Sequence, residues 1–394
     1  MWNSCILCYE IKNRNEINIK MIKHNYSFKS EDIIIPKESL VIYDLDRFTL
    51  LEKLKSLINK ININIETKSI PILEVPRIDR ENIIYNEHGN YFLGKKARII
   101  KYNDKDNEFL KLLRIIELIK ELLTKNLHSL YSEIYWDNSE IFKDQKDCEK
   151  IVNLLATILQ AHYANLNILH KIQGYCVGKL MIKDRNDIIE CEALGSGGWG
   201  ISPFREHVEI IESGAEFIIV VNNRSIMESL GDLRIWKKIP CILISTQSIP
   251  DYTTREFLKR LVMTLKIPVF GLVDLNPFDL NSLLTYGYGD VQTAHETSKL
   301  AINNFYWLGI LCNDLKEYDF IRECQIPMNE SETNYIKLLL NEVPVKSNEL
   351  LREELKLMLK FQVKTRIELI SSARFKDFVK YIIEKIEKIN LIEF

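Results

Sequence analysis

The hydrophobic positions of this chain change their spacing several times, and each change predicts a different kind of element. Across residues 109–123 apolar side chains recur three and four positions apart, which is the spacing of one helix face. Residues 127–136 and 147–160 repeat this pattern. Two strand-like runs, 175–182 and 188–191, follow and are joined by a polar turn. Three helices followed by a β-hairpin is the order of elements in a winged helix, although other domains share it.

Further along, short apolar runs alternate with a helical segment. Residues 217–221, 241–244 and 269–273 have the composition of buried strands. Residues 253–265 lie between the last two runs and have the pattern of a crossover helix. This alternation predicts an α/β domain with a parallel, doubly wound sheet.

The two ends of the chain are less distinctive. Near the start we expect a strand over residues 39–43 and an amphipathic helix over residues 47–58, followed by strand-like alternation at residues 61–65. Beyond residue 330 the chain is mainly helical, and the clearest segments are 334–340, 348–361 and 375–389. We therefore predict an α/β extension over 1–66, a winged-helix domain over 67–204, and a parallel α/β domain with helical C-terminal elements over 205–394.

Composition and charge place few limits on function. With 394 residues, 46% hydrophobic and 27% charged, the chain has the composition of an ordinary globular protein with more than one core. Its formal net charge is -2, so no global positive field points to nucleic acid. A nucleic-acid partner would therefore need a local basic surface.

Location and thiol chemistry follow from what the sequence does not contain. No run of about 18 apolar residues predicts a membrane span. Glu10 and Lys12 come too early for the apolar centre of a signal peptide. Eight cysteines in 394 residues suit reduced thiols, so we expect the cytoplasm or nucleoid, or the nucleus of a eukaryote. Cys5 and Cys8 have metal-site spacing, but a zinc site needs about four ligands and no second pair follows.

The most informative stretch is residues 269–278, where an apolar strand runs directly into Asp274-Leu275-Asn276-Pro277. Ligands of open α/β sheets bind beyond the carboxyl ends of the strands, and an acidic residue there can hold a metal ion near a phosphate. The turn resembles the Asp-x-Asp-Pro-Tyr-Gly element in the A subunit of topoisomerase VI and in its meiotic double-strand-break relatives. Asn276 stands at the second acid.

Other segments resemble that family in the same order, over roughly residues 70–320. They are Pro76-Arg77, Asn82 to Tyr85, Leu93-Gly94, Gly178-Lys179-Leu180, Gly197 to Ile201, Pro250 to Arg255, Thr285 to Gly289, His295-Glu296 and Trp307-Leu308-Gly309. The resemblance implies a CAP-like winged-helix domain carrying a tyrosine nucleophile, followed by a Toprim domain that binds Mg²⁺. It also implies a homodimer that acts on double-stranded DNA with an ATPase B-type subunit.

The family's nucleophile element resembles Arg-Glu-Ile-Tyr-Tyr, in which the second tyrosine attacks a DNA phosphate. The matching positions here run from Ser132 to Trp136. An indole N–H donates a hydrogen bond but cannot attack, and Ser132 replaces the arginine. Tyr135 is the remaining catalytic candidate, but one residue along a helix turns a side chain by about 100°. Tyr131, five residues before Trp136, restores the direction only loosely.

The implied metal site is altered as well. Its glutamate position holds Asn222, and its aspartate pair holds Asp274 and Asn276. One of three carboxylates is retained, so we expect Mg²⁺ binding to be weak or absent. Asp279 replaces the family's glycine, and we expect it to cap the helix that starts near Leu280.

Basic residues on two elements are candidates for contacts to DNA phosphates, which position a duplex without recognising its sequence. They are Lys179, Lys183 and Arg185 on the predicted hairpin, and Arg255, Lys259 and Arg260 on the predicted crossover helix. Charges on solvated faces are the equally simple alternative.

Three functions remain open on the sequence. The first is a topoisomerase VI A-like dimeric scaffold that binds DNA or partners and is impaired in tyrosine-mediated cleavage. The second is an active type IIB topoisomerase A-type subunit that makes transient double-strand breaks. The third is a partner-binding protein that does not contact DNA. Salt-dependent duplex binding separates the first from the third, and cleavage identifies the second.

Overall fold

The computed structural model describes most of the chain, in the ranges 33–66, 71–102, 107–246, 250–387 and 391–394. Cys5 and Cys8 therefore lie outside the described residues. The contacts divide the chain into two compact units. Among the described residues, the larger unit comprises residue 33, 172–288 and 299–394, and the smaller comprises 34–171 and 289–298.

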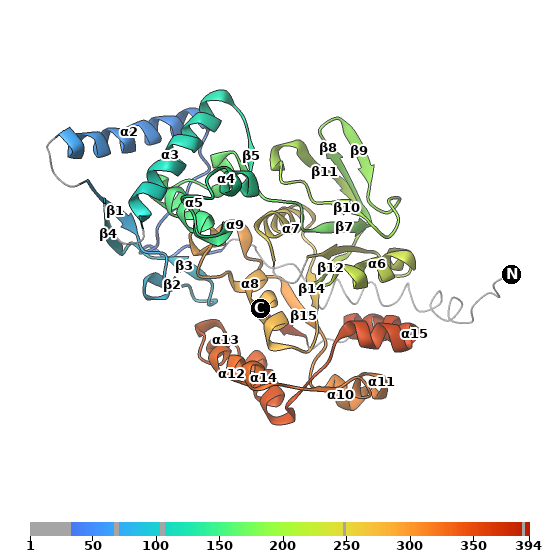
Figure 1. Cartoon of the computed structure of the whole chain (residues 1–394). Helices are drawn as coiled ribbons and strands as arrows, with labels where there is room; N and C mark the ends of the chain where they lie inside the picture. Colours follow the sequence, from blue (N-terminus) through green and yellow to red (C-terminus); the bar gives the residue numbers. More distant parts are fainter. Residues whose placement is uncertain (1–32, 67–70, 103–106, 247–249, 388–390) are drawn as a thin grey trace. The chain divides into compact units, whose positions relative to one another are not determined.

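A mixed seven-stranded sheet forms the core of the larger unit (Figure 1). Across the sheet its strands are β10 (Trp199–Gly200), β7 (Tyr175–Gly178), β13 (Cys241–Ser245), β12 (Phe217–Val221), β14 (Val269–Leu272), β15 (Phe305–Gly309) and β18 (Ile392–Glu393). The three predicted strands β12, β13 and β14 are parallel, β15 adds a fourth parallel strand that was not predicted, and the outer strands pair antiparallel. Every residue of β12, β13 and β14 is buried, which explains their uninterrupted apolar composition.

Helices connect these strands and cover the sheet. They are α6 (Arg224–Asp232), the predicted crossover helix α7 (Tyr252–Leu265) and α8 (Pro277–Tyr288). The chain then continues through α9 (Thr297–Leu300), of which residues 297–298 lie in the smaller unit. Asp251 begins α7 because its carboxylate accepts a hydrogen bond from the Thr254 amide at 3.0 Å.

A second, three-stranded sheet belongs to the same unit. It has the order β11 (Val208–Ser213), β8 (Leu180–Asp184), β9 (Asp187–Glu190). The predicted hairpin turn is confirmed between β8 and β9, with Arg185 at φ 57°. The strand predicted over 175–182 is instead divided into β7 and β8, which belong to different sheets. Because β7 pairs with β13, residues 172–204 group with the large sheet, and the expected boundary at residue 204 falls inside this unit. A winged-helix arrangement of hairpin and helices stays a prediction.

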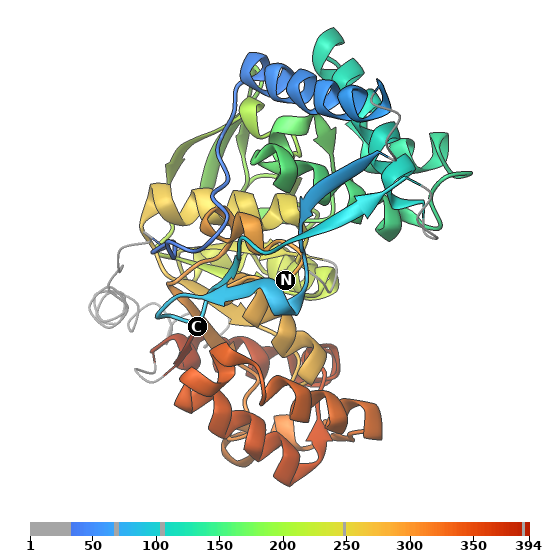
Figure 2. The same ribbon diagram turned by 90° about the vertical axis from the view of Figure 1, so that its left-hand side faces the viewer.

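The C-terminal part is helical, as predicted (Figure 2). Its helices are α10 (Asp314–Glu317), α11 (Asp319–Arg322), α12 (Glu330–Leu339), α13 (Val343–Ser347), α14 (Glu349–Phe361) and α15 (Ile367–Glu387). Short strands β16 (Ile326–Pro327) and β17 (Val363–Lys364) pair between them. A buried network fixes α15, since Asp314 accepts hydrogen bonds from Tyr381 at 2.7 Å and Lys385 at 2.9 Å.

The smaller unit combines helices with short strands. Its helices are α2 (Arg47–Glu66), α3 (Glu108–Lys125), α4 (Tyr131–Asp137) and α5 (Gln145–Leu159). Its strand pairs are β1 (Ile72–Pro76) with β4 (Ala97–Lys101), β2 (Ile83–Tyr85) with β3 (Tyr91–Leu93), and β5 (Ser129–Leu130) with β6 (Ile168–Leu169). The stripes predicted for α3 and α5 form the core, where Leu112, Ile115, Val152 and Leu155 are each 1% exposed or less.

Three expectations for the first 66 residues are wrong. α2 continues to Glu66, so the alternating isoleucines are helical: Ile61 is buried, while Ile63 and Ile65 are exposed. Residues 39–43 form only isolated bridges, not a strand. Residues 34–66 are not a separate extension, because they pack within the smaller unit. The helix expected over 127–136 begins instead at Tyr131, after β5.

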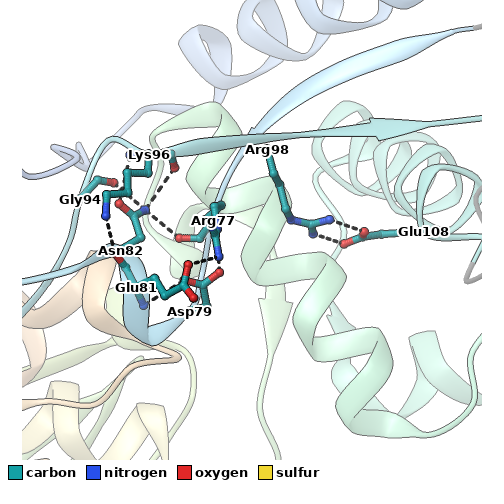
Figure 3. Close-up of polar contacts among 8 residues, drawn as sticks. All are labelled: Arg77, Asp79, Glu81, Asn82, Gly94, Lys96, Arg98 and Glu108. Atoms are coloured by element: carbon teal, nitrogen blue, oxygen red, sulfur yellow. Dashed lines mark hydrogen bonds and ion pairs between the residues drawn. The ribbon is translucent and has the colours of Figure 1, made fainter.

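A hydrogen-bonded cluster around Asn82 links the segments Pro76-Arg77, Asn82 to Tyr85 and Leu93-Gly94 of the resemblance (Figure 3). The buried Asn82 amide group donates to the carbonyls of Arg77 at 2.8 Å, Gly94 at 3.1 Å and Lys96 at 3.2 Å. Its oxygen accepts from the Lys96 amide at 3.0 Å. A Cβ at Gly94 would lie 2.5 Å from this oxygen, so glycine is required there. These segments therefore have a structural role.

None of the helices in the described part of the chain has the length and apolarity that a membrane crossing requires. The six described cysteines are free thiols.

Candidate functional site

The nucleophile position of the resemblance lies on α4. Tyr131 and Ile134 bury one face of this helix, and the Tyr131 hydroxyl donates to the Gln145 carbonyl at 2.9 Å. This packing turns Trp136 outward, where it is 66% exposed. Tyr135 is half-buried, with its ring centroid 5.1 Å from that of Trp136. The outward position thus carries an indole without a nucleophilic oxygen.

The two nearby tyrosines differ from position 136 in their surroundings or their direction. Burial raises the pKa of the Tyr131 hydroxyl far above its usual range, and its proton is committed to the Gln145 carbonyl. Tyr135 points in a different direction from Trp136, because consecutive helical residues are about 100° apart. A phosphate placed to react at position 136 would be out of line with either hydroxyl.

The metal positions of the resemblance lie together at one end of the large sheet. β12 ends at Val221 and is followed by Asn222, while the neighbouring parallel strand β14 is followed by Asp274. The Asn222 side-chain amide donates to the carboxylate of Asp279, a residue of α8, so a carboxylate from α8 lies beside the end of β12. No local pattern indicates this contact, because it joins positions 57 residues apart.

The side chains of Asp274 and Asn276, beyond the end of β14, accept hydrogen bonds from backbone amides of the protein. The Asp274 carboxylate accepts a hydrogen bond at 2.9 Å from the amide of Ile367, the first residue of α15. Asn276 accepts from the Phe278 amide at 3.1 Å and thereby stabilises the first turn of α8. The expectation that Asp279 begins this helix is wrong, because α8 already starts at Pro277.

A second asparagine also ties the strand ends to α15. Asn223 accepts from the Ser225 amide at 2.8 Å, which begins α6, and its amide group donates to Glu368 at 2.7 Å. Together with the Asp274–Ile367 bond, this contact places the start of α15 against the strand ends. Sequence reasoning missed it, since α15 lies more than 90 residues beyond β14 in the chain.

The electrostatics of this edge differ from those of a strong Mg²⁺ site. Burial raises the pKa of Asp274. Burial, together with the neighbouring charge of Asp274, raises the pKa of Asp279 to about 7. Mg²⁺ prefers charged oxygens in octahedral geometry, and two of the three matching positions offer amides. No three His, Cys, Asp or Glu residues in the described ranges are arranged to hold a metal ion. The residues present therefore do not fit the Mg²⁺ site that the resemblance implies.

Two of the six basic candidates are wrong because they are buried. Arg255 is 2% exposed and Lys259 is 6% exposed on the packed face of α7. The third residue of that helix, Arg260, donates to the carbonyls of Arg205 at 3.1 Å and Val208 at 2.7 Å. Its guanidinium stabilises the start of β11, so we no longer propose it as a phosphate contact.

The hairpin candidates lie at the surface but beside carboxylates. Lys179 pairs with Glu192 at 2.6 Å, and Lys183 lies 3.7 Å from Glu209. Arg185 stands over the ring of Phe204, 5.5 Å from its centroid. These contacts partly neutralise the hairpin's positive charge, and its role as a phosphate contact stays a prediction.

The His295-Glu296 segment has a structural role in the smaller unit. Both Glu296 oxygens are engaged, one with the His162 ring at 3.1 Å and the other with the Tyr163 amide at 2.5 Å. The three side chains His162, His295 and Glu296 are buried. This contact joins residues more than 130 positions apart, which no local pattern could indicate.

The parallel sheet with its altered acidic edge defines the protein as a Toprim-type α/β protein. Family comparison agrees, because the Toprim domain of the topoisomerase 6 A-type/Spo11 proteins matches residues 217–386. A second family model, "Type IIB DNA topoisomerase", matches residues 107–168, which include α4. The chain belongs to the family formed by the A subunits of topoisomerase 6 and the Spo11 proteins.

Individual relatives lie in both branches of that family. The DNA topoisomerase 6 A subunit of Arabidopsis thaliana is 33% identical over 67% of this chain and 62% of its own length. The type 2 DNA topoisomerase 6 A subunit of Aeropyrum pernix is 27% identical over 80% of this chain and 89% of its own length. Human meiotic recombination protein SPO11 is 26% identical over 67% of each chain. The matched region spans 62% and 60% of two plant topoisomerase 6 A subunits, from Arabidopsis and rice.

Proposed function

We propose that this chain is an A-type subunit that engages double-stranded DNA, a B-type subunit, or both, as a homodimeric scaffold without forming a phosphotyrosyl bond. The observation that carries the proposal is Trp136, an exposed indole at the position from which the family's tyrosine attacks. Covalent cleavage needs an oxygen nucleophile at that position, and nearby hydroxyls at other angles are poor substitutes.

The strand-end chemistry supports the same proposal independently. The amides of Asn222 and Asn276 carry no charge, and the Asp274 carboxylate is bonded to the start of α15. A cleavage reaction needs positive charge near the attacked phosphate, and this edge is poorly suited to hold the ion that supplies it. Loss of one function could be compensated, but loss of both leaves binding as the activity that the scaffold can perform.

The test is a search for a covalent protein–DNA bond. Full-length protein is incubated with supercoiled plasmid, Mg²⁺ or Mn²⁺, ATP and a B-type subunit, and denaturant then traps any covalent complex. A family member of the A type that retains the tyrosine serves as the positive control. Tyr135→Phe tests the neighbouring hydroxyl, and filter binding over a range of salt concentrations measures DNA affinity.

We expect no covalent complex and a DNA affinity that falls steeply with salt. A covalent break that disappears in Tyr135→Phe would overturn the proposal and make the chain an active type IIB subunit. Absence of both cleavage and DNA binding, with retained binding to the B-type subunit, would favour the partner-binding alternative. The acidic surroundings of Lys179 and Lys183 favour that alternative.

A further inference from the structure

The outer face of the β11–β8–β9 sheet carries an unusual set of side chains. Leu180 and Ile182 of β8 are buried, so the alternating residue Met181 faces the opposite side. In the sheet register Met181 lies between Glu190 of β9 and Glu212 of β11. Both glutamates are exposed, and a methionine thus stands between two carboxylates in one cross-strand row.

A cavity of about 310 Å³ opens against this row. Its lining includes Met181, Glu190 and Glu212, together with Lys179 and Glu192. The Lys179 ammonium is already paired with Glu192 at 2.6 Å. The carboxylates of Glu190 and Glu212 have no ion pair or hydrogen bond with any residue in the described ranges, so the cavity holds two uncompensated negative charges.

The dimensions of the row suit a cationic side chain. Neighbouring strands lie about 4.8 Å apart, so the backbones that carry Glu190 and Glu212 are separated by about 10 Å. Long glutamate side chains from both sides can reach a guanidinium or ammonium group placed between them. Met181 supplies apolar surface for the methylene stem of an arginine or lysine.

An apolar side chain extends the same face beyond the cavity. Ile188 of β9 lies two residues before Glu190, so it shares the face of Met181, and it is 67% exposed. An exposed isoleucine beside unpaired carboxylates is suited to a protein segment that combines apolar and basic residues. The same charges repel the phosphates of nucleic acid.

We propose that this face is a docking surface for a protein partner, and that the cavity receives an arginine or lysine from an apolar–basic segment of that partner. The cavity, the register and the charge of the sheet support this docking surface whether or not the chain cleaves DNA.

The experiment uses the full-length protein and a fluorescein-labelled peptide of alternating leucine and arginine. A second peptide carries glutamate in place of each arginine. Binding is measured by fluorescence anisotropy for the wild type, for the Glu190→Gln/Glu212→Gln variant, and for Glu209→Gln. Glu209 belongs to β11, does not line the cavity and lies 3.7 Å from Lys183, so Glu209→Gln controls for the loss of a carboxylate elsewhere on the same sheet. These side chains are exposed, and circular dichroism checks that each variant is folded.

We expect the arginine peptide to bind, and the double variant to weaken it about tenfold, as the loss of two partly exposed ion pairs predicts. Glu209→Gln should stay within about twofold of the wild type. Failure of the arginine peptide to bind, equal binding of the glutamate peptide, or equal losses in both variants would overturn the proposal.

Discussion

The role of Asp274 can be decided by stability measurements. In a metal site this carboxylate would be held ready for a cation, whereas here it accepts a hydrogen bond from Ile367 and anchors the start of α15. Asp274→Ala removes that acceptor. A hydrogen bond to a charged group contributes about 1.5–3 kcal/mol, and the raised pKa of Asp274 shows that its burial offsets part of this.

We therefore expect Asp274→Ala to lower the free energy of unfolding by about 1–2 kcal/mol. In a unit of this size that corresponds to a fall of about 2–8 °C in Tm. Calorimetry and urea unfolding without metal provide the measurement. Asp319→Ala is the control, because the Asp319 side chain is 77% exposed and pairs with Arg322, three residues along the chain. Its loss should cost less than about 0.5 kcal/mol.

The same unfolding measurements are repeated with Mg²⁺ to test whether the site binds the ion. If the site bound Mg²⁺ with a Kd of about 1 mM, adding about 10 mM would stabilise the fold by about 1.4 kcal/mol. We expect no such gain in the wild type. A Mg²⁺-dependent gain that Asp274→Ala lacks would refute the anchoring role. If Asp274→Ala were more stable than the wild type without metal, the anchoring role would also be refuted. Such a gain would mean that the Asp274 carboxylate is repelled by neighbouring carboxylates more than its hydrogen bond stabilises it.

Three further outcomes follow from the smaller unit. Asn82→Ala should lower the free energy of unfolding of the smaller unit by about 2–3 kcal/mol in urea, because buried backbone groups lose their hydrogen-bond partner. The control Glu81→Ala removes an exposed ion pair and should cost under about 0.5 kcal/mol. Burial lowers the pKa of His170 from 6.5 to about 4, so as the pH falls the unfolded state binds this proton before the folded state does. The free energy of unfolding should therefore fall by up to about 3 kcal/mol as the pH drops from 6.5 to 4, and His170→Gln should flatten this pH profile. Trp136→Tyr should give no covalent DNA complex in the denaturant trap, since Ser132 and the amides of the strand ends remain unchanged; a complex would show that the hydroxyl alone was missing.

The spacing of hydrophobic residues was sufficient to predict an element whose own burial determines that spacing. The strands β12, β13 and β14 could be predicted because strands covered on both faces need uninterrupted apolar runs. The helices α3 and α5 were predicted from their single apolar stripes. The spacing gave the wrong prediction for Ile61, Ile63 and Ile65, because isoleucines at every second position over five residues also fit a strand. The preceding turns of α2 decide the conformation, because Ile61 continues the buried stripe of Leu54 and Leu57.

The residue types at the key positions were determined by the sequence, since no fold can give Trp136 a hydroxyl or give Asn222 a negative charge. What these residues contact was decided only by the tertiary structure. Arg255 and Lys259 look like exposed basic residues until α7 packs and buries them. The bonds that join Asn222 to Asp279 and Asp274 to Ile367 cross 57 and 93 residues. A single sequence states the chemistry of each side chain, but its neighbours are set by packing between segments that are distant in the chain.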